Sequence, residues 1–429
     1  MIVEITLNGQ SVGTAEWSAS GGYAVFQYSD EFRALGIEPS PIVMPVEGKS
    51  YQTNRSHIHF HNLPYLLSDS MPDDFGNLMM REWFRQRQLS YNDVNPVDRL
   101  TYVGKRGMGA LEYEPVNHME KSSVRLDVTE LIEVARLVLE QKEKTRYPAL
   151  DTETLSDILR VGTSAGGARA KALIAMKTDG EGKIEELRPG DIIQPEGYSY
   201  WILKFDGANE KMLGESLGKG LLEYAYYKLA IEAKIEMTEC RLLEENRRFH
   251  FLTKRFDRTE AGGKIHSQTL GALAGIDYRV PKASSYETLF RVMKRLQLPY
   301  NHFEQQFRRM IFNVIARNQD DHVKNFSFLM DRQGKWSISP AYDLTFQYSP
   351  GGKWTNEHQT SINGKFDHFV REDLLGFGEA FGIKKAANIL EEIIAAVSQW
   401  RRIAREVGIP ASEAEKINRL LRLKDYENA

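Results

Sequence analysis

The chain has 429 residues, of which 41% are hydrophobic, and this supplies enough apolar side chains for the cores of two or three domains. Its 56 basic and 59 acidic residues give a formal net charge of −3, which argues against a protein that coats nucleic acid through bulk positive charge. The single cysteine, Cys240, excludes an internal disulfide framework, and because the sequence shows no signal peptide or long apolar run, we expect a soluble protein of the reducing cytoplasm.

The first 115 residues are predicted to form a small β-rich region. Asn8 and Gly9 separate two runs of alternating apolar residues, which is the strongest short-range signal for a β-hairpin. An amphipathic helix is expected at 78–89, and a glycine-rich turn at 103–115 closes the region.

A polar linker at 116–123 leads to a second predicted region, residues 124–258. It begins with a helix near residue 128, where Asp127 is the candidate N-cap and Glu130 stands three residues on, as in a capping box. A glycine-rich turn, one more helix and four strand-forming runs follow, at 161–171, 221–234, 172–177, 198–205, 240–245 and 250–257. The last two runs are expected to pair as a hairpin.

The last predicted region, residues 259–429, is mainly helical. Long helices are expected at 286–296, 303–318 and 385–404 from the spacing of their apolar residues. Because strands dominate the first part of the chain and helices the last part, the order of the elements predicts an α+β protein with two lobes.

Three alternating histidines, His57, His59 and His61, form the first candidate site. In a strand all three would lie on one face, as the ligands of a metal ion could. No aspartate, glutamate or cysteine flanks them at ligand spacing. We therefore interpret them as a polar strand face, or as histidines that bond to nearby backbone groups.

The second candidate is a pair of features that suit a nucleotide. The turn TSAGGARAKAL is rich in small residues that let backbone N–H groups approach phosphates, although it lacks the Gly-Lys-Ser/Thr of a P-loop. Lys204 interrupts an apolar strand, and Glu223 lies at the start of the next amphipathic helix. A strand lysine and a helix glutamate orient the phosphates of ATP in protein kinases. Taken alone, each feature is more often a plain turn or a surface charge.

The third candidate is the polar motif NQDDHVKNFSFL. Asp320 and Asn325 have the D-x-x-x-x-N spacing of the kinase catalytic loop, in which the aspartate accepts the hydroxyl proton and the asparagine binds Mg²⁺. A predicted hairpin follows and leads to Asp343, a second candidate Mg²⁺ ligand. His322 and Lys324 could contact phosphate or brace the loop.

The order of these features predicts a kinase-like phosphotransferase. A glycine turn, strand lysine, helix glutamate, D-x-x-x-x-N motif, hairpin and aspartate rarely follow one another by chance. The weaker alternative is a metal-dependent nuclease with Asp320, Asp321 and His322 as ligands. Consecutive loop residues rarely converge on one ion, and this reading gives Lys204 no role.

The motifs NQDDHVKNFSFL and SPAYDLT also resemble the signature of HipA-type serine/threonine kinases, the toxins of bacterial toxin–antitoxin pairs. The resemblance covers nearly the whole chain, since VGKRGMGALEYEP is similar to the small N-terminal subdomain of that family and KRFDR to its hinge. It implies a two-lobed protein-kinase-like fold, with an N-terminal subdomain at 1–115, a nucleotide-binding N-lobe at 124–258 and a mainly helical C-lobe at 259–429.

The resemblance assigns roles residue by residue. Asp320 resembles the catalytic base, Asn325 and Asp343 the Mg²⁺ ligands, and Lys204 the lysine that binds the ATP phosphates. Ser164 falls where the family carries a serine that it phosphorylates to inactivate itself. Further residues match nucleotide-binding positions, namely Gly166, Gly167, Ala168, Arg169, Ala170, Lys171, Lys254, Arg255, Phe256, His322, Lys324, Asn325 and Tyr342.

The resemblance further implies ATP and Mg²⁺ as cofactors and no membrane partner. It implies a HipB-like helix-turn-helix antitoxin, operator DNA bound mainly through that antitoxin, and a protein substrate such as an aminoacyl-tRNA synthetase. The alternative function is that of a transcriptional co-repressor that acts through the antitoxin. Two residues depart from the family: Asp321 stands where the well-studied member has glycine, and Lys254 replaces a hinge glutamate.

Overall fold

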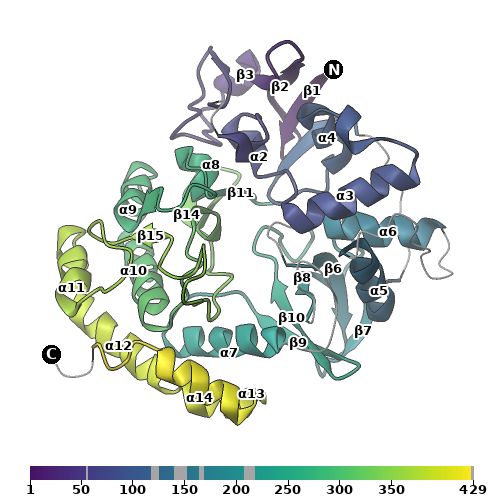
Figure 1. Cartoon of the computed structure of the whole chain (residues 1–429). Coiled ribbons are helices and arrows are strands. Elements are labelled where there is room, and N and C mark those ends of the chain that lie inside the picture. The colour runs from purple at the N-terminus through teal and green to yellow at the C-terminus, as the bar shows by residue number, and fades with distance from the viewer. Residues whose placement is uncertain (55–56, 117–124, 140–151, 164–168, 207–217, 427–429) are drawn as a thin grey trace.

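The computed structural model describes residues 1–54, 57–116, 125–139, 152–163, 169–206 and 218–426 of the chain (Figure 1). Two five-stranded antiparallel sheets lie in the first 254 residues, and a three-stranded sheet and a two-stranded pair lie farther along the chain. Most of the long helices follow the second sheet. The predicted α+β fold, with a strand-rich lobe and a mainly helical lobe, is confirmed.

The first sheet is built by β1 (Ile2–Leu7), β2 (Gln10–Ser18), β3 (Tyr23–Tyr28), β4 (Ser50–Tyr51) and β5 (Leu111–Glu114), in the spatial order β4-β3-β2-β1-β5. Leu7 pairs with Gln10, so Asn8 and Gly9 form the two-residue turn between β1 and β2. Both have the positive φ angle that a type I′ turn requires, 52° and 82°. The hairpin prediction is confirmed.

The helical segments of this part of the chain are α1 (Asp30–Arg33), η1 (Ile58–Phe60), α2 (Tyr65–Ser68), α3 (Asp74–Gln86), η2 (Tyr91–Asp93) and α4 (Pro96–Val103). The helix predicted at 78–89 is α3, with its start and end a few residues earlier than expected. The strand face considered for His57, His59 and His61 is wrong. The chain there bonds locally, from the Phe60 amide to the His57 carbonyl, and forms the 3-10 turn η1.

The second sheet has the order β7-β6-β8-β10-β9. Its strands are β6 (Lys171–Thr178), β7 (Ile184–Pro189), β8 (Tyr198–Lys204), β9 (Cys240–Glu245) and β10 (Arg248–Lys254), and three helices pack around it, α5 (Val128–Leu139), α6 (Thr152–Thr163) and α7 (Lys219–Glu232). The Asp127 carboxylate accepts the backbone N–H groups of Thr129 and Glu130 at 2.8 and 3.1 Å, which confirms the predicted N-cap of α5. The predicted hairpin of β9 and β10 is also confirmed.

The glycine-rich turn predicted at 161–171 does not extend over all of these residues. Residues 161–163 belong to the last turn of α6, and Lys171 already opens β6. Residues 164–168 of this turn, and residues 117–123 of the predicted linker, lie outside the described residues.

The C-terminal part begins with β11 (His266–Thr269), α8 (Leu270–Ala274), β12 (Ser284–Ser285), α9 (Tyr286–Arg295), α10 (Tyr300–Ile315), η3 (Val323–Asn325), β13 (Ser327–Met330), β14 (Trp336–Ile338) and β15 (Thr360–Ser361). It ends with α11 (Arg371–Ala380), α12 (Ala386–Ser398), α13 (Trp400–Val407) and α14 (Ala411–Leu420). The predicted hairpin of β13 and β14 is confirmed, and β11 adds a third strand. The single helix predicted at 385–404 is wrong, because the chain divides at Gln399 into α12 and α13.

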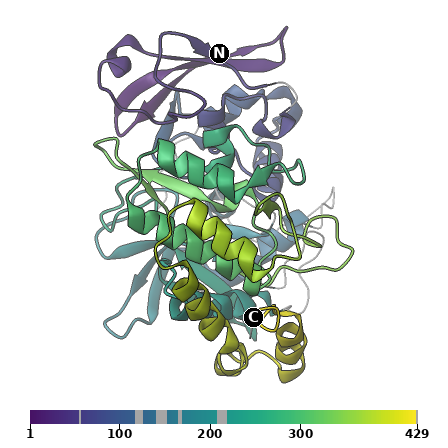
Figure 2. The same cartoon turned by 90° about the vertical axis from the view of Figure 1, so that its left-hand side faces the viewer.

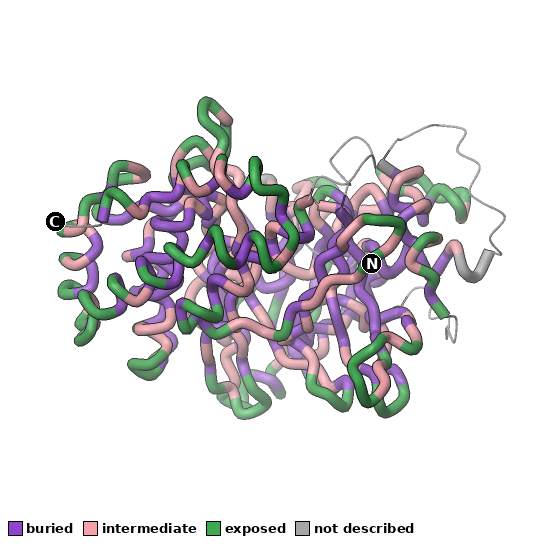
Figure 3. The backbone as a smooth tube through the Cα atoms, turned by 90° about the horizontal axis from the view of Figure 1, so that it is seen from below, coloured by how far each residue is buried: buried purple, intermediate pink, exposed green. Residues whose placement is uncertain are grey.

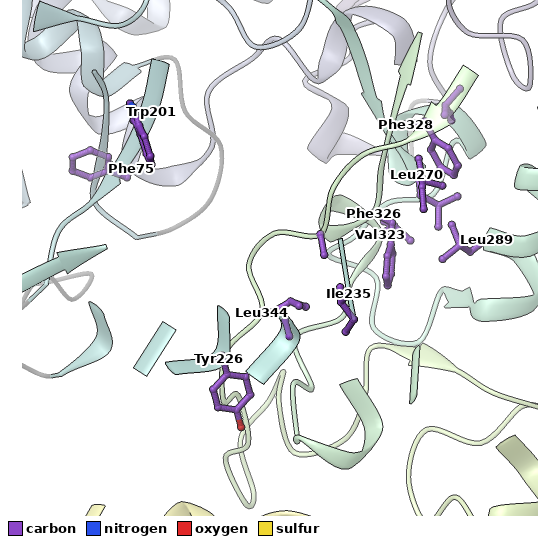
Figure 4. Close-up of a cluster of buried hydrophobic side chains, with 14 of the residues drawn as sticks. Phe75, Trp201, Tyr226, Ile235, Leu270, Leu289, Val323, Phe326, Phe328 and Leu344 are labelled. Atoms are coloured by element: carbon purple, nitrogen blue, oxygen red, sulfur yellow. The ribbon is translucent and has the colours of Figure 1, made fainter. Parts of the chain in front are cut away.

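One continuous core joins these parts. Figure 2 shows the first sheet at one end of the molecule and the yellow C-terminal helices at the other, and Figure 3 shows buried backbone running between the two ends. Val323, Phe326 and Phe328 belong to this core beside Leu270 and Leu289 (Figure 4), so the chain on both sides of Asn325 is anchored in apolar packing. No helix in the described part of the chain has the length and apolar character that a membrane span requires.

Candidate active site

Lys204, the last residue of β8, is the centre of a buried group of charges. Its Nζ lies 2.5 Å from Oε1 of Glu223 on α7 and also contacts the carboxylate of Asp343. Helix α7 runs beneath the second sheet toward the C-terminal helices (Figure 1). Because Asp343 follows the third sheet, this one ammonium joins the two lobes. Burial works against the charged form of Lys204, but Asp343 and Glu223 outweigh it and raise the pKa of the amine above its ordinary value.

Asp343 lies just after the third sheet, with the left-handed φ of 53° that aspartate tolerates better than most residues. Its side chain is 36% exposed. Burial pushes the pKa of this carboxyl upward, but Lys204 and Lys171 pull it down to about 2. Asp343 is therefore an ionised, partly accessible carboxylate at neutral pH.

Arg169 and Lys171 bring further positive charge to the same place. Arg169 donates to Oε2 of Glu223 at 2.6 Å and to the carbonyl of Phe205 at 3.1 Å. Burial lowers the pKa of the Lys171 amine to about 8, although Asp343 acts in the opposite direction. The buried residue between them, Ala170, accepts the Phe205 amide. Ser164, Gly166, Gly167 and Ala168 lie outside the described residues.

Asp320 and Asn325 are joined through the backbone of the loop that carries both. The Asn325 side-chain amide donates to the Asp320 carbonyl at 2.6 Å, and the Asn325 backbone N–H donates to the His322 carbonyl at 2.8 Å. The Asp320 side chain is 39% exposed, and its partial burial raises the pKa of the carboxyl, against the effect of His322 at 3.9 Å. A partly accessible carboxylate with a raised pKa suits a general base.

His322, Lys324 and Tyr342 brace this loop. Nδ1 of His322 accepts the Lys324 backbone N–H at 3.3 Å, and the Tyr342 hydroxyl donates to the Lys324 carbonyl at 2.6 Å. The Lys324 ammonium contacts the carboxylate of Asp73, just before α3, and this contact helps to raise the pKa of the lysine. Of the two roles left open by the sequence, these contacts correspond to bracing.

The Asp73 contact lies beside a small pocket between the first 115 residues and the C-terminal lobe, lined by His59, Phe60, His61, Ser68, Asp69, Asp73, Thr269, Gly271, Ile276, Tyr278 and Lys324. Burial lowers the pKa of His61 to about 4, so this imidazole is neutral at neutral pH. No group of three or more histidine, cysteine, aspartate or glutamate side chains with metal-binding geometry occurs among the described residues.

Lys254 ends β10, and Arg255 and Phe256 follow it at the hinge. The Lys254 N–H donates to the Glu239 carbonyl at 2.9 Å. The Arg255 guanidinium is buried and turned toward Asp257, with two hydrogen bonds at 2.8 and 2.9 Å. The Phe256 ring lies 5.5 Å from that of Tyr342. The structure thus brings Phe256 toward the residues around Asp343 and gives Arg255 a structural contact.

Asp321 is the residue whose place the sequence did not predict. Its side chain is fully buried and bonded to the chain that follows Asp343. An acid beside the candidate base was the available signal, but its partners lie far away in the sequence.

The donor set fits Mg²⁺ bound together with a nucleotide. Mg²⁺ in such sites takes one or two protein oxygen ligands and completes its shell with phosphates and water. Asp343 supplies an ionised carboxylate, and Asn325 keeps its side-chain oxygen free of the bond that its amide makes to Asp320. Lys204, Lys171 and Arg169 supply the positive charge that phosphates need.

Two protein-family models match this chain. Residues 163–401 match the family model of the HipA-like C-terminal domain, and residues 3–114 match that of the HipA N-terminal domain. A "Putative kinase" of Haemophilus influenzae is 24% identical over 216 residues, which are 43% of this chain and 62% of that protein. The "Putative kinase Y4dM" of Sinorhizobium fredii is 31% identical over 102 residues, which are 23% of this chain and 24% of that protein.

The fold is similar to a chain from the complex of Shewanella oneidensis MR-1 HipA, HipB and operator DNA, with a TM-score of 0.68 over 99% of this chain and 97% of that one. Their sequence identity is 16%, so this likeness shows the fold alone. The chain spans about three fifths of the length of the Haemophilus protein and about a quarter of the Sinorhizobium protein.

Proposed function

The chain belongs to the HipA family, and we propose that it is an ATP- and Mg²⁺-dependent serine/threonine protein kinase that acts as the toxin of a toxin–antitoxin pair. The observation that carries this proposal is the contact of Lys204 with both Glu223 and Asp343, in a chain whose loop after α10 holds Asp320 and Asn325. A strand lysine, a helix glutamate and a metal-binding aspartate form the same group in protein kinases.

In the proposed reaction Asp320 accepts the proton of a serine or threonine hydroxyl while that oxygen bonds to the γ-phosphorus and the bond to the leaving oxygen of ADP breaks. Lys204 and Lys171 hold the phosphates through their charge. Asn325 and Asp343 are the residues that would hold Mg²⁺, which neutralises phosphate charge when bound. The bond from the Asn325 amide to the Asp320 carbonyl keeps the base and this ligand in fixed relation.

We further propose that Ser164 is phosphorylated by the kinase itself and that this inactivates it. The support is the family membership and the place of Ser164, directly after α6 and before the strand that begins with Lys171. We propose a component of translation, such as an aminoacyl-tRNA synthetase, as the protein substrate.

The proposed partner is a HipB-like helix-turn-helix antitoxin that carries the kinase to operator DNA. The net charge of −3 supports DNA contact through the partner rather than through this chain. A co-repressor role of this kind is compatible with catalysis, and it is the second candidate function.

Transfer of labelled phosphate from ATP tests the proposal. Wild-type protein with Mg²⁺ should label itself or a protein in a cell lysate, and Asp320→Ala should lower the rate by about a thousandfold, since the base contributes only when the proton moves. Mass spectrometry should find phosphate on Ser164 in wild-type protein and not in Asp320→Ala. Equal labelling by both proteins would contradict the assignment of Asp320, and no labelling by wild-type protein would contradict the kinase.

A further inference from the structure

Asp320 and Asp321 are neighbours in the chain but lie in opposite surroundings. The Asp320 side chain is 39% exposed, whereas the Asp321 side chain has no exposed surface. A buried carboxylate is costly unless hydrogen bonds replace the water that it loses. Asp321 must therefore be held by specific hydrogen-bond donors, and the positions of those donors indicate its role.

The Asp321 carboxylate accepts hydrogen bonds from four groups. The hydroxyl of Tyr286 and Nδ1 of His358 lie 2.9 Å from Oδ2, and the backbone N–H groups of Gln359 and Thr360 lie 2.8 and 3.4 Å from Oδ1. The Thr360 hydroxyl also donates to the Asp321 carbonyl at 2.5 Å. Both the side chain and the backbone of Asp321 are thus bound to residues 358–360.

The His358 ring is itself buried and suited to a donor at Nδ1. Its side chain has no exposed surface, and its Nε2 has no hydrogen-bond partner among the described residues. A neutral imidazole with its proton on Nδ1 fits both facts, because the proton then faces Asp321 and no N–H is left buried without an acceptor. This donor is not interchangeable with an apolar side chain of similar size.

The residues around Asp321 belong to rigid elements. Thr360 and Ser361 form β15, which pairs with β12 directly before α9, and Tyr286 is the first residue of α9. The Tyr286 hydroxyl also accepts the side-chain amide of Asn313 on α10 at 3.0 Å. Asp321 therefore connects the loop of Asp320 to α9, α10 and β15 at once.

The chain between Asp343 and His358 is bound to the same loop at its start as well. The Gln347 backbone exchanges hydrogen bonds with the Arg317 carbonyl at 3.0 Å and the Gln319 N–H at 3.1 Å. Residues 348–357 therefore lie between two contacts with the Asp320 loop, one made by Gln347 and one made by residues 358–360. His358 is bonded directly to Asp321, the residue next to the candidate base.

We propose that Asp321 and His358 are positioning residues that hold the Asp320 carboxylate and Asn325 in place relative to residues 344–360. The inference rests on the proposed function and deepens it. The carbonyl of Asp320 is held by Asn325 and the carbonyl of Asp321 by Thr360, so rotation of either peptide group would move the base. A displacement of about 1 Å of a catalytic group costs on the order of a hundredfold in rate.

The test compares His358→Ala with His358→Asn, whose amide nitrogen can occupy the place of Nδ1. We expect His358→Ala to lower kcat by about tenfold to a hundredfold, with ADP affinity unchanged within about twofold, and His358→Asn to keep kcat within about threefold of wild type. His302→Ala on α10 is the matched control, because it removes a half-buried histidine that has no bond to the loop. Asp321→Asn should behave as His358→Ala does.

Hydrogen exchange gives a readout that does not depend on activity. In His358→Ala the amides of residues 318–326 and 358–361 should both exchange at least about tenfold faster than in wild-type protein, while α10 keeps its protection. Equal kcat in His358→Ala and wild type, unchanged exchange in 318–326, or a kcat loss in His358→Asn as large as in His358→Ala would overturn the positioning role. A wild-type protein that transfers no phosphate would instead contradict the proposed function, and the exchange measurement would still decide whether His358 is coupled to the loop.

Discussion

Two groups of buried charge in the middle of the molecule use the same kinds of side chain in different ways. The hinge cluster consists of Arg255, Asp257 and Arg258, whose side chains are 0, 0 and 4% exposed. The Lys204 cluster consists of Lys204, Glu223 and Asp343, and it leaves Asp343 36% exposed. In the hinge cluster one carboxylate lies between two cations, whereas in the Lys204 cluster one cation lies between two carboxylates, and one of these, Asp343, is accessible from outside the protein.

The charged groups of the hinge cluster are hydrogen-bonded to one another and to backbone groups of the protein. Both oxygens of Asp257 are bonded to guanidinium groups, and the Gly109 N–H adds a further bond at 2.7 Å. The extra positive charge of the arginines is bonded to carbonyl groups, including those of Gly109 and Gly190. Because Gly109 and Gly190 belong to different parts of the chain, this cluster fastens the first 115 residues to the second sheet.

The Lys204 cluster is not closed in this way. Lys171 and Arg169 add positive charge around two acids, and Asp343 keeps part of its surface accessible. An accessible anion beside an excess of cations can bind a metal ion and phosphates, whereas a fully bonded cluster can only stabilise the fold. The comparison therefore predicts that one cluster serves catalysis and the other stability, and mutations can separate the two.

The largest expected effect is that of Asp343→Asn on catalysis. Asn keeps the shape but loses the charge that a metal ion and Lys204 require, so phosphoryl transfer should fall by at least about a thousandfold, about 4 kcal/mol. The free energy of unfolding should change by less than about 1 kcal/mol, because Lys204 retains Glu223. Steady-state kinetics and urea unfolding measure the two quantities.

Asp331→Asn is the matched control for Asp343→Asn. Asp331 lies in the turn between β13 and β14, where an asparagine oxygen can accept the same backbone N–H groups of Gln333 and Lys335. Its activity should equal that of wild-type protein. If Asp343→Asn instead lost stability and kept its rate, the two clusters would have the same role.

The next largest effect is the loss of stability in Asp257→Asn. The substitution leaves the buried arginines without their carboxylate and turns an NH₂ group toward their donors, so the free energy of unfolding should fall by about 3 kcal/mol or more. Urea unfolding measures this. The exposed pair of Asp30 and Arg33 supplies the control, since Asp30→Asn should cost less than about 1 kcal/mol. A folded Asp257→Asn protein of wild-type stability would contradict the structural role of the hinge cluster.

The two clusters also differ in how far the sequence predicts them. Lys204, Glu223 and Asp343 follow one another in the order that protein kinases use, and local patterns predict the strand β8 and the helix α7 that carry the first two. Arg255 is predicted at a nucleotide-binding position because the segment KRFDR resembles the hinge of the family. The Arg255 side chain is held by Asp257 and by the carbonyl of Gly190. Gly190 is 65 residues away in the sequence, and a local sequence pattern cannot predict a contact over that separation.

The fold shows the same difference between features set by neighbouring residues and features set by distant ones. The turn at Asn8 and Gly9 and the cap at Asp127 are set by residues that touch their neighbours, and both predictions are confirmed. The break at Gln399 was missed, because the apolar spacing continues through it and Trp400 turns its ring toward α14, where Nε1 donates to the Ala414 carbonyl. Local patterns do not predict the contacts of Asp321 for the same reason, since its partners come from α9 and from residues 358–360.

The contact between Asp73 and Lys324 tests whether the N-terminal region and the catalytic loop are energetically coupled. Asp73 and Lys324 are in contact, with side chains 12 and 23% exposed, and Lys324 precedes Asn325. We expect a coupling free energy of about 1–2 kcal/mol from a double-mutant cycle of Asp73→Asn and Lys324→Met in urea unfolding, because the pair is mostly buried. Single-mutant effects that simply add would show that the contact resembles a surface ion pair.

The smallest predicted effect is a pH dependence of ADP affinity, caused by Lys171 beside the Lys204 cluster. With a pKa of about 8 in the folded protein, this amine carries its proton at neutral pH and loses it as the pH rises. Bound phosphate favours the ammonium, so ADP affinity measured by calorimetry without Mg²⁺ should fall by about tenfold between about pH 7.5 and pH 9. Stability should move the other way. The unfolded lysine keeps its proton up to about pH 10.4, and the free energy of unfolding should therefore rise with pH above about pH 8.

Two variants assign this pH dependence to Lys171. Lys171→Arg stays charged throughout and should keep its ADP affinity at high pH, whereas Lys171→Met should bind weakly at both pH values and lose the dependence. A wild-type affinity that did not change with pH, or a dependence that survived in Lys171→Met, would place the titrating group elsewhere. The hinge cluster offers an internal comparison, because its cations are arginines bonded within the chain and Asp257 has its pKa held well below the ordinary range by Arg255 and Arg258 against the effect of burial. Lys264, near the arginines of the hinge cluster, also has its pKa lowered to about 8 by burial, so the Lys171 variants are what assign a change of ADP affinity to the Lys204 cluster.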